Sequence, residues 1–222
     1  MHSHLLPGID DGVKSFEESI EVITSLQAMG YNKFITTPHI MSDFYRNTPE
    51  VIRSLCDELR LELAKSNIDV EIDCAAEYYM DDMFDELLAS KSLMTFGDNN
   101  VLVETSYLNP VSNLKETFFN MQMAGYQPVL AHPERYVFMY SDFEQYNDIF
   151  GRDVLFALNL GSFVGYYSKE SKKIIEKLVK NKMVHFIGSD IHNMRLIPHF
   201  QRAIQTSAYQ QCSAYKLINN SL

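Results

Sequence analysis

The sequence lacks the features of several special classes of protein. It has three cysteines, Cys56, Cys74 and Cys212, an odd number with no Cys-x-x-Cys pair, which argues against a disulfide framework. No basic stretch followed by an apolar one opens the chain, so no signal peptide is indicated. These absences predict a protein of a reducing compartment, the cytoplasm. No apolar run approaches the ~18 residues that a membrane helix needs, so we expect no membrane span.

The chain also lacks an excess of positive charge. Its formal net charge is −10, which argues against binding nucleic acid or acidic lipid through bulk charge. A small anion stays possible, because a local site can reverse the overall sign. With 9 glycines and 7 prolines the chain is not collagen-like or low in complexity, and its 46% hydrophobic content excludes a disordered chain.

Strand-like and helix-like segments alternate along the 222 residues, with no linker or repeat to divide them. We therefore expect one domain, residues 1–222, of the α/β class. Predicted strands are 33–37, 70–75, 101–104, 128–131, 154–160 and 184–188, with His2–Leu5 as a candidate seventh. Predicted helices are 15–30, 81–89, 113–124, 143–150, 168–180 and 196–209, with another that starts at Thr48 and Pro49. A (β/α) barrel fits this pattern, and an open doubly wound sheet is the competing interpretation.

Nine metal-ligand side chains follow the carboxyl ends of these strands or flank the first one. They are His2, His4, Asp11, His39, Glu77, Glu104, His132, Asp190 and His192. In a parallel barrel these ends converge on one rim, where active sites are found. Imidazole and carboxylate together suit manganese, iron or zinc, and the absence of cysteine favours an open catalytic site over a closed structural one. Nine ligands exceed the needs of one ion, so we expect two or three. Asp10 neighbours Asp11, and we prefer Asp11. His185, inside a predicted strand, is interpreted as a core residue or one that supports a ligand, and His199 as structural.

The same residues indicate a phosphate monoester as substrate. Three divalent ions would outweigh the charge of the four carboxylates, which makes the site locally positive, and they could lower the pKa of a bound water to near 7. Arg135 and Arg195 each follow a ligand histidine by three positions, and guanidinium groups bind phosphate oxygens in pairs. A cysteine phosphatase is excluded, because no cysteine here is followed six positions later by arginine.

The segments HSHLLPGIDDG, TPHI, AAEYY, LVET, AHPERY and GSDIHN, in this order, carry a resemblance. They resemble the polymerase and histidinol phosphatase (PHP) family, and more closely its bacterial protein-tyrosine phosphatase branch, associated with capsular and extracellular polysaccharide synthesis. The resemblance spans the chain from His2 to about Arg195. It implies a distorted (β/α)7 TIM-like barrel with a trinuclear metal centre and a manganese-, iron- or zinc-dependent enzyme.

The resemblance also implies a role for each ligand and a partner. One ion would be held by His2, His4, Glu77 and Asp190; a second by Glu77, Glu104 and His132; and the third by Asp11, His39 and His192. Arg135 matches an arginine that contacts phosphate, and Arg195 resembles a second one at a shifted spacing. The implied substrate is the phosphotyrosine-rich tail of a bacterial tyrosine kinase that drives polysaccharide export.

The sequence therefore predicts a metal-dependent protein-tyrosine phosphatase, with Arg135, Asp190 and His192 as candidate catalytic residues and Arg135 and Arg195 binding the phosphate. A small-molecule phosphatase of the same family, such as a histidinol phosphatase, is the first rival. An amidohydrolase barrel is the second, although none of these strands ends in the lysine that it normally carries. A catalytically dead domain is the third, and the intact set of ligands argues against it.

Overall fold

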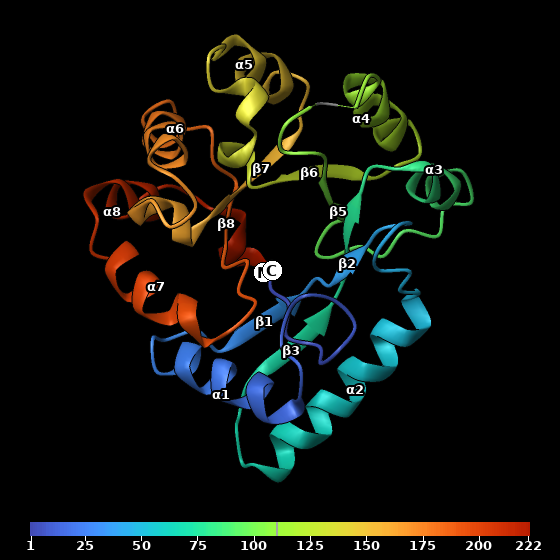
Figure 1. Cartoon of the computed structure of the whole chain (residues 1–222), viewed down its shortest axis with the longest axis vertical. Helices are drawn as coiled ribbons and strands as arrows, with labels where there is room; N and C mark the ends of the chain where they lie inside the picture. Colours follow the sequence, from blue (N-terminus) through green and yellow to red (C-terminus); the bar gives the residue numbers. More distant parts are fainter. Residues whose placement is uncertain (110) are drawn as a thin grey trace.

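The computed structural model describes residues 1–109 and 111–222 as a parallel sheet curled on itself and surrounded by helices (Figure 1). The strands are β1 (Lys33–Thr36), β2 (His39–Ile40), β3 (Glu71–Cys74), β4 (Glu77–Tyr79), β5 (Asn100–Glu104), β6 (Gln127–Ala131), β7 (Leu155–Asn159) and β8 (Phe186–Gly188). The helices are α1 (Phe16–Gln27), α2 (Pro49–Lys65), α3 (Asp82–Ala89), α4 (Leu114–Met123), α5 (Glu144–Phe150), α6 (Lys169–Lys180), α7 (Ile197–Ala203) and α8 (Ser207–Ser213).

Every strand pair is parallel, and the order of the strands follows the chain. Six strands form one sheet in the order β2-β4-β5-β6-β7-β8, and β1 pairs with β3 alongside. Because the order never reverses in the described residues, the sheet has no switch point of the doubly wound kind, and that alternative is wrong. The first two predicted strands are each interrupted, at Thr37–Pro38 and at Ala75–Ala76, and continue as β2 and β4.

The N-terminal segment lies between the two edges of the curled sheet. The backbone N–H of Thr37 donates to the carbonyl of Ser3 at 2.7 Å, and that of Asp190 donates to the carbonyl of His2 at 2.8 Å. Ser3 also forms an isolated parallel bridge with Ile191. The predicted α/β class and parallel arrangement are confirmed, whereas a complete barrel is not, since residues 2–5 form a bridge rather than a regular strand.

Local capping explains where the helices begin. Ser15, Thr48 and Ser168 each accept a hydrogen bond from a backbone N–H in the first turn of α1, α2 and α6. The prediction of one last helix over 196–209 is wrong. Thr206 ends it, because its hydroxyl donates to the carbonyl of Ala203 at 2.7 Å and accepts from the N–H of Tyr209 at 3.3 Å, which caps a new helix, α8.

Two apolar clusters cover the two faces of the sheet. The larger cluster packs the outer face against the helices. The smaller one fills the space that the sheet encloses, with Ile35, Ala75, Phe96, Leu102, Val129, Ala131, Ala157 and Phe186 as its buried members. Among the helices of the described residues, none is long and apolar enough to cross a membrane.

Candidate metal centre

The ligand side chains share the inner face of the sheet with the smaller apolar cluster. Successive side chains of a strand point to opposite faces, so residues two or four positions apart point the same way. Each inward apolar residue is therefore followed, two or four positions later, by a predicted ligand on the same strand or just beyond it. The pairs are Ile35 and His39, Ala75 and Glu77, Leu102 and Glu104, and Phe186 and Asp190. The alternation brings imidazoles and carboxylates together at the carboxyl ends of the strands.

Three of the ligands depart from regular strand geometry. His2, His132 and Asp190 have φ angles of 60°, 35° and 49°, in the left-handed region that residues with a side chain rarely adopt. Ala131 faces the interior, so an unbroken strand would point His132 outward toward the helices. The left-handed turn at His132 instead brings its ring to the ligand cluster. Such strain persists where the surrounding structure enforces it, typically at functional sites.

The innermost group consists of His2, His4, Glu77 and Asp190, all fully or almost fully buried. The Nε2 atom of His2 lies 3.1 Å from Glu77 Oε2 and 3.4 Å from Asp190 Oδ1. The Nε2 atom of His4 lies 3.4 Å and 3.3 Å from the same two oxygens. These four donors surround one point, as the first predicted set requires.

Glu77 also reaches the second predicted set. Its Oε1 atom lies 3.1 Å from His132 Nε2, which is in turn 3.6 Å from Glu104 Oε2. The Nδ1 atom of His39 lies 3.1 Å from Glu104 Oε1 and 3.4 Å from Glu77 Oε2, so His39 joins Glu77 and Glu104 as a further possible ligand. Glu77 therefore lies within reach of both predicted sets.

The third set is more open to solvent. The Oδ1 atom of Asp11 lies 3.3 Å from His192 Nε2 and 3.5 Å from His39 Nε2. The His4 ring stacks on that of His192 with centroids 4.0 Å apart, which joins this group to the innermost one. All nine predicted ligands thus lie in one continuous cluster.

The cluster has the donor chemistry of a cation site. Several of its buried atoms have no hydrogen-bond partner in the described residues, including His2 Nε2, His4 Nε2, His39 Nδ1 and Glu77 Oε2. Burial alone would raise the pKa of Glu77 and of Asp190, but nearby histidines, His2 first, lower both pKa values well below their usual range. Ionised oxygens and unpartnered imidazole nitrogens that face one another fit bound divalent cations.

Asp10 has a different role from its neighbour Asp11. Its Oδ2 atom lies 2.8 Å from His4 Nδ1 and accepts from the backbone N–H of His39, while Oδ1 accepts from that of Gly12. Burial opposes ionisation, yet the hydrogen bond with His4 leads the contacts that lower the Asp10 pKa to about 2. A carboxylate on Nδ1 leaves Nε2 of His4 as the metal-ligating atom.

Three residues that the sequence analysis did not single out hold Asp190 and Arg135. The Oδ2 atom of Asp190 accepts from Asn159 Nδ2 at 2.6 Å, from Arg135 Nη1 at 2.8 Å and from the Tyr167 hydroxyl at 3.2 Å. The Arg135 guanidinium also lies between the rings of Tyr107 and Tyr167, 4.5 Å and 4.0 Å from their centroids. Asn159 could have been found as the polar residue near the end of the apolar strand VLFALNL.

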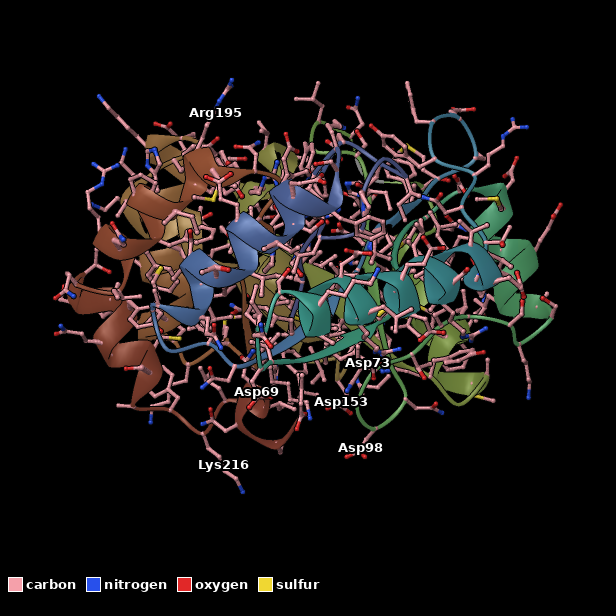
Figure 2. All side chains as sticks on the ribbon, turned by 90° about the horizontal axis from the view of Figure 1, so that it is seen from below. Asp69, Asp73, Asp98, Asp153, Arg195 and Lys216 are labelled. Atoms are coloured by element: carbon pink, nitrogen blue, oxygen red, sulfur yellow. The ribbon has the colours of Figure 1, made fainter. Side chains whose placement is uncertain are left out.

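A cavity of about 470 Å³ opens above the cluster. Its lining includes Arg135 together with Asp11, His39, Glu104, His132, Asp190 and His192. Arg195 does not line this cavity. It is exposed and extends away from the molecule into solvent (Figure 2). His185 and His199 also lie outside the cluster, since His185 stacks on Phe150 and His199 lies 2.7 Å from an Arg202 nitrogen.

Fold and donor set together define a parallel α/β protein with a candidate cation site at the carboxyl ends of its strands. Residues 1–217 match the family model described as capsular polysaccharide synthesis, CpsB/CapC, and the chain belongs to this family. The predicted resemblance to capsule-associated tyrosine phosphatases is thereby confirmed.

Curated relatives and a solved structure agree with this assignment. The chain is 28% identical to the tyrosine-protein phosphatase YwqE of Bacillus subtilis over 88% of this chain and 77% of YwqE. It is 28% identical to the tyrosine-protein phosphatase CpsB of Streptococcus pneumoniae over 91% of this chain and 86% of CpsB. A crystal structure from a study of YwqE and CpsB, described there as unique metal-dependent tyrosine phosphatases, matches with a TM-score of 0.85 at 25% identity, over 96% of this chain and 90% of that one.

Proposed function

We propose that this chain is a metal-dependent phosphatase that hydrolyses phosphotyrosine in proteins. The observation that carries the proposal is the cluster of nine imidazole and carboxylate side chains beneath an open cavity that Arg135 also lines. The named activity of the relatives supports the same reaction. The small-molecule alternative, a histidinol-phosphatase-like enzyme, is not favoured by these relatives.

The cofactor of this proposal is two or three divalent ions of manganese, iron or zinc. His2, His4, Glu77 and Asp190 would hold one; Glu77, Glu104 and His132 a second; and Asp11, His39 and His192 the third. When bound, such ions polarise phosphoryl oxygens and neutralise the charge that develops on them.

The chain's own residues then orient the substrate. Arg135 points at the cavity from the Asp190 side and would bind phosphoryl oxygens with the guanidinium nitrogens that Asp190 does not use. His192, at the more open side of the cluster, and Asp190 are the candidates to move a proton. Tyrosinate is a fair leaving group, with a phenol pKa of ~10, so it needs little general-acid help. The role of Arg195 in binding phosphate stays a prediction, since this contact would require its side chain to turn toward the cavity.

The physiological setting of the proposal follows the family. The substrate would be the phosphotyrosine-rich tail of a bacterial tyrosine kinase that regulates polysaccharide export, and the enzyme would act in the cytoplasm. We also propose that residues 1–222 form one domain and that His2–Leu5 acts as the seventh strand of a distorted (β/α)7 barrel. The hydrogen bonds of Ser3 and His2 to both edges of the sheet support this closure.

One experiment tests the function directly. The purified protein is analysed for bound metal, and phosphate release from a phosphotyrosine peptide is measured with and without a chelator, and again after addition of manganese, iron or zinc. We expect activity that the chelator abolishes and one of these metals restores. Turnover of histidinol phosphate at a higher kcat/KM than the peptide would instead favour the small-molecule alternative. Peptide hydrolysis that resists complete removal of metal would contradict the proposal.

A further inference from the structure

Two segments form the walls of the cavity, and the mechanism above uses neither of them. The first is the turn Met41–Tyr45 after β2, which two backbone hydrogen bonds between Met41 and Tyr45, of 2.9 Å and 3.0 Å, hold closed. The second is the loop Thr105–Leu108 after β5. Tyr79, at the end of β4, lies between them, because β4 separates β2 from β5 in the sheet. The walls are therefore built by neighbouring strands.

The walls carry aromatic and apolar side chains, in contrast to the charged floor. Met41, Tyr45, Tyr79, Tyr107 and Leu108 all line the cavity. The Tyr45 ring stacks on the His39 ring at an interplanar angle of 16° with centroids 5.7 Å apart, so it stands directly beside a candidate metal ligand. A flat ring that enters the cavity would meet Tyr45 as soon as its phosphoryl group reached the cluster.

The outer ends of the walls are apolar and unusually exposed. Phe44 is 75% exposed at the tip of the turn, and Leu108 is 67% exposed on the loop. Large apolar side chains that stay in water gain most when a ligand covers them. Leu108 lines the cavity, and the Phe44 ring lies 6.4 Å from that of Tyr45, which also lines it, so a chain whose side chain enters the cavity would pass beside both residues.

We propose that these segments select the aryl group of the substrate: the Tyr45 ring packs against the phosphotyrosine ring, and Phe44 and Leu108 contact the residues beside it. This inference rests on the proposed function and deepens it. The innermost of the charged groups, His2, His4, Glu77 and Asp190, are buried, so a long, rigid phosphotyrosine reaches toward them while its ring lies between the walls. A phosphoserine brings its own backbone to the depth where the ring would lie, and the walls then hinder its entry.

The test compares three substrates with four variants. The substrates are a phosphotyrosine peptide, p-nitrophenyl phosphate and the matched phosphoserine peptide. The variants are Tyr45→Ala, Tyr45→Phe, Phe44→Ser and Leu108→Ser. Phe119→Ser on α4 is the matched control, because Phe119 is 58% exposed but belongs to neither wall segment. Metal content and the inhibition constant of inorganic phosphate are measured for each protein.

We expect Tyr45→Ala to raise KM for both aryl substrates about tenfold, with the phosphate inhibition constant unchanged, and Tyr45→Phe to restore KM. Phe44→Ser and Leu108→Ser should raise KM for the peptide about threefold and more than KM for p-nitrophenyl phosphate, which has no flanking residues. The ring that stacks on His39 is that of Tyr45, and Phe44 and Leu108 take no part in this contact. Their two variants therefore test the walls even if Tyr45→Ala loses metal.

The outcomes separate this inference from the proposed function. An enzyme that hydrolyses no aryl phosphate with any metal overturns the function and the inference together. An active enzyme in which Tyr45→Ala keeps both its metal and its native KM overturns the role of Tyr45. Peptide KM values for Phe44→Ser and Leu108→Ser equal to that of Phe119→Ser overturn the role of the outer wall.

Discussion

The two ends of the curled sheet use the same inner face for opposite purposes. At the amino ends of the strands, the enclosed space is filled by apolar side chains such as Ile35, Leu102 and Phe186. At the carboxyl ends the same face carries the imidazoles and carboxylates of the candidate metal centre. A second cavity, of about 350 Å³, lies near the chain termini, the end of α1 and the start of β1, and no histidine, aspartate or glutamate of the described residues lines it.

The comparison shows how one register serves stability and chemistry together. Buried charged groups are costly, and here they face one another instead of apolar neighbours. Apolar packing at the amino ends fixes the position of each strand. Because side chains alternate between faces, the residues two or four positions further along then point to the same inner face as the apolar ones. We therefore expect substitutions at the carboxyl ends to remove metal and activity, and substitutions at the amino ends to reduce stability.

The largest effect is expected at the ligands. His132→Ala or His39→Ala should lower kcat/KM at least about 10⁴-fold, since each would remove a donor to a charge-neutralising ion, while the circular dichroism spectrum stays native. His199→Ala is the control, because His199 pairs with Arg202 outside the cluster. Near-native activity of either ligand variant after metal removal and repletion would show that its assignment is wrong.

At the other end of the strands, Phe186→Ala should act on stability. Phe186 is fully buried and packs edge-on against Phe96, with ring centroids 5.7 Å apart. Its truncation should reduce the free energy of unfolding by about 3–5 kcal/mol in a denaturant titration. The variant that remains folded should bind as much metal as the native protein. A loss of metal without a loss of stability would break the division between the two ends.

Much of this division could be read from the sequence, because it depends on local patterns. Apolar runs that end in His, Asp or Glu predicted both the strands and the ligands, and a parallel sheet brings such ends together. Capping residues such as Ser15 and Thr48 located the helix starts. The different roles of Asp10 and Asp11 depend on the tertiary structure. Only the fold shows that Asp10 contacts Nδ1 of His4 while Asp11 lies beside His39 and His192.

The positive φ angles of His2, His132 and Asp190 could not be predicted from the sequence. Nothing in the strand pattern PVLA shows that His132 adopts a φ of 35° and turns inward, since neither residue type nor spacing encodes a left-handed histidine. Asn159 stands out as a polar residue near the end of an apolar strand, but its bond to Asp190 and that of Tyr167 span 31 and 23 positions, respectively, and have no local signal. The walls of the cavity likewise depend on strand order, which places Tyr79 between two loops.

A smaller effect is expected from the two arginines. Arg135→Ala should raise KM about 10- to 100-fold with a smaller change in kcat, because the charged donor to the phosphoryl group is lost. Arg195→Ala is the matched comparison, and its KM should change less, since the side chain extends into solvent (Figure 2). Kinetics on a phosphotyrosine peptide measure both. Equal increases in KM would bring Arg195 into the phosphate site, and an unchanged Arg135→Ala enzyme would remove Arg135 from it.

The smallest effect concerns the protein freed of metal. Burial disfavours the charged form of His39, but Glu77 and Glu104 outweigh it and raise the His39 pKa to about 9, above the ordinary 6.5. A raised pKa means that the stabilisation is complete below pH 6.5 and is lost as pH rises through 9. The Tm of chelator-treated protein should therefore fall by a few degrees over this range, and less so in His39→Gln. Metal-loaded protein should lack this decline, because cations then take the place of the proton. A metal-free Tm that rises between pH 6.5 and 9 would contradict the close approach of His39 to the two glutamates.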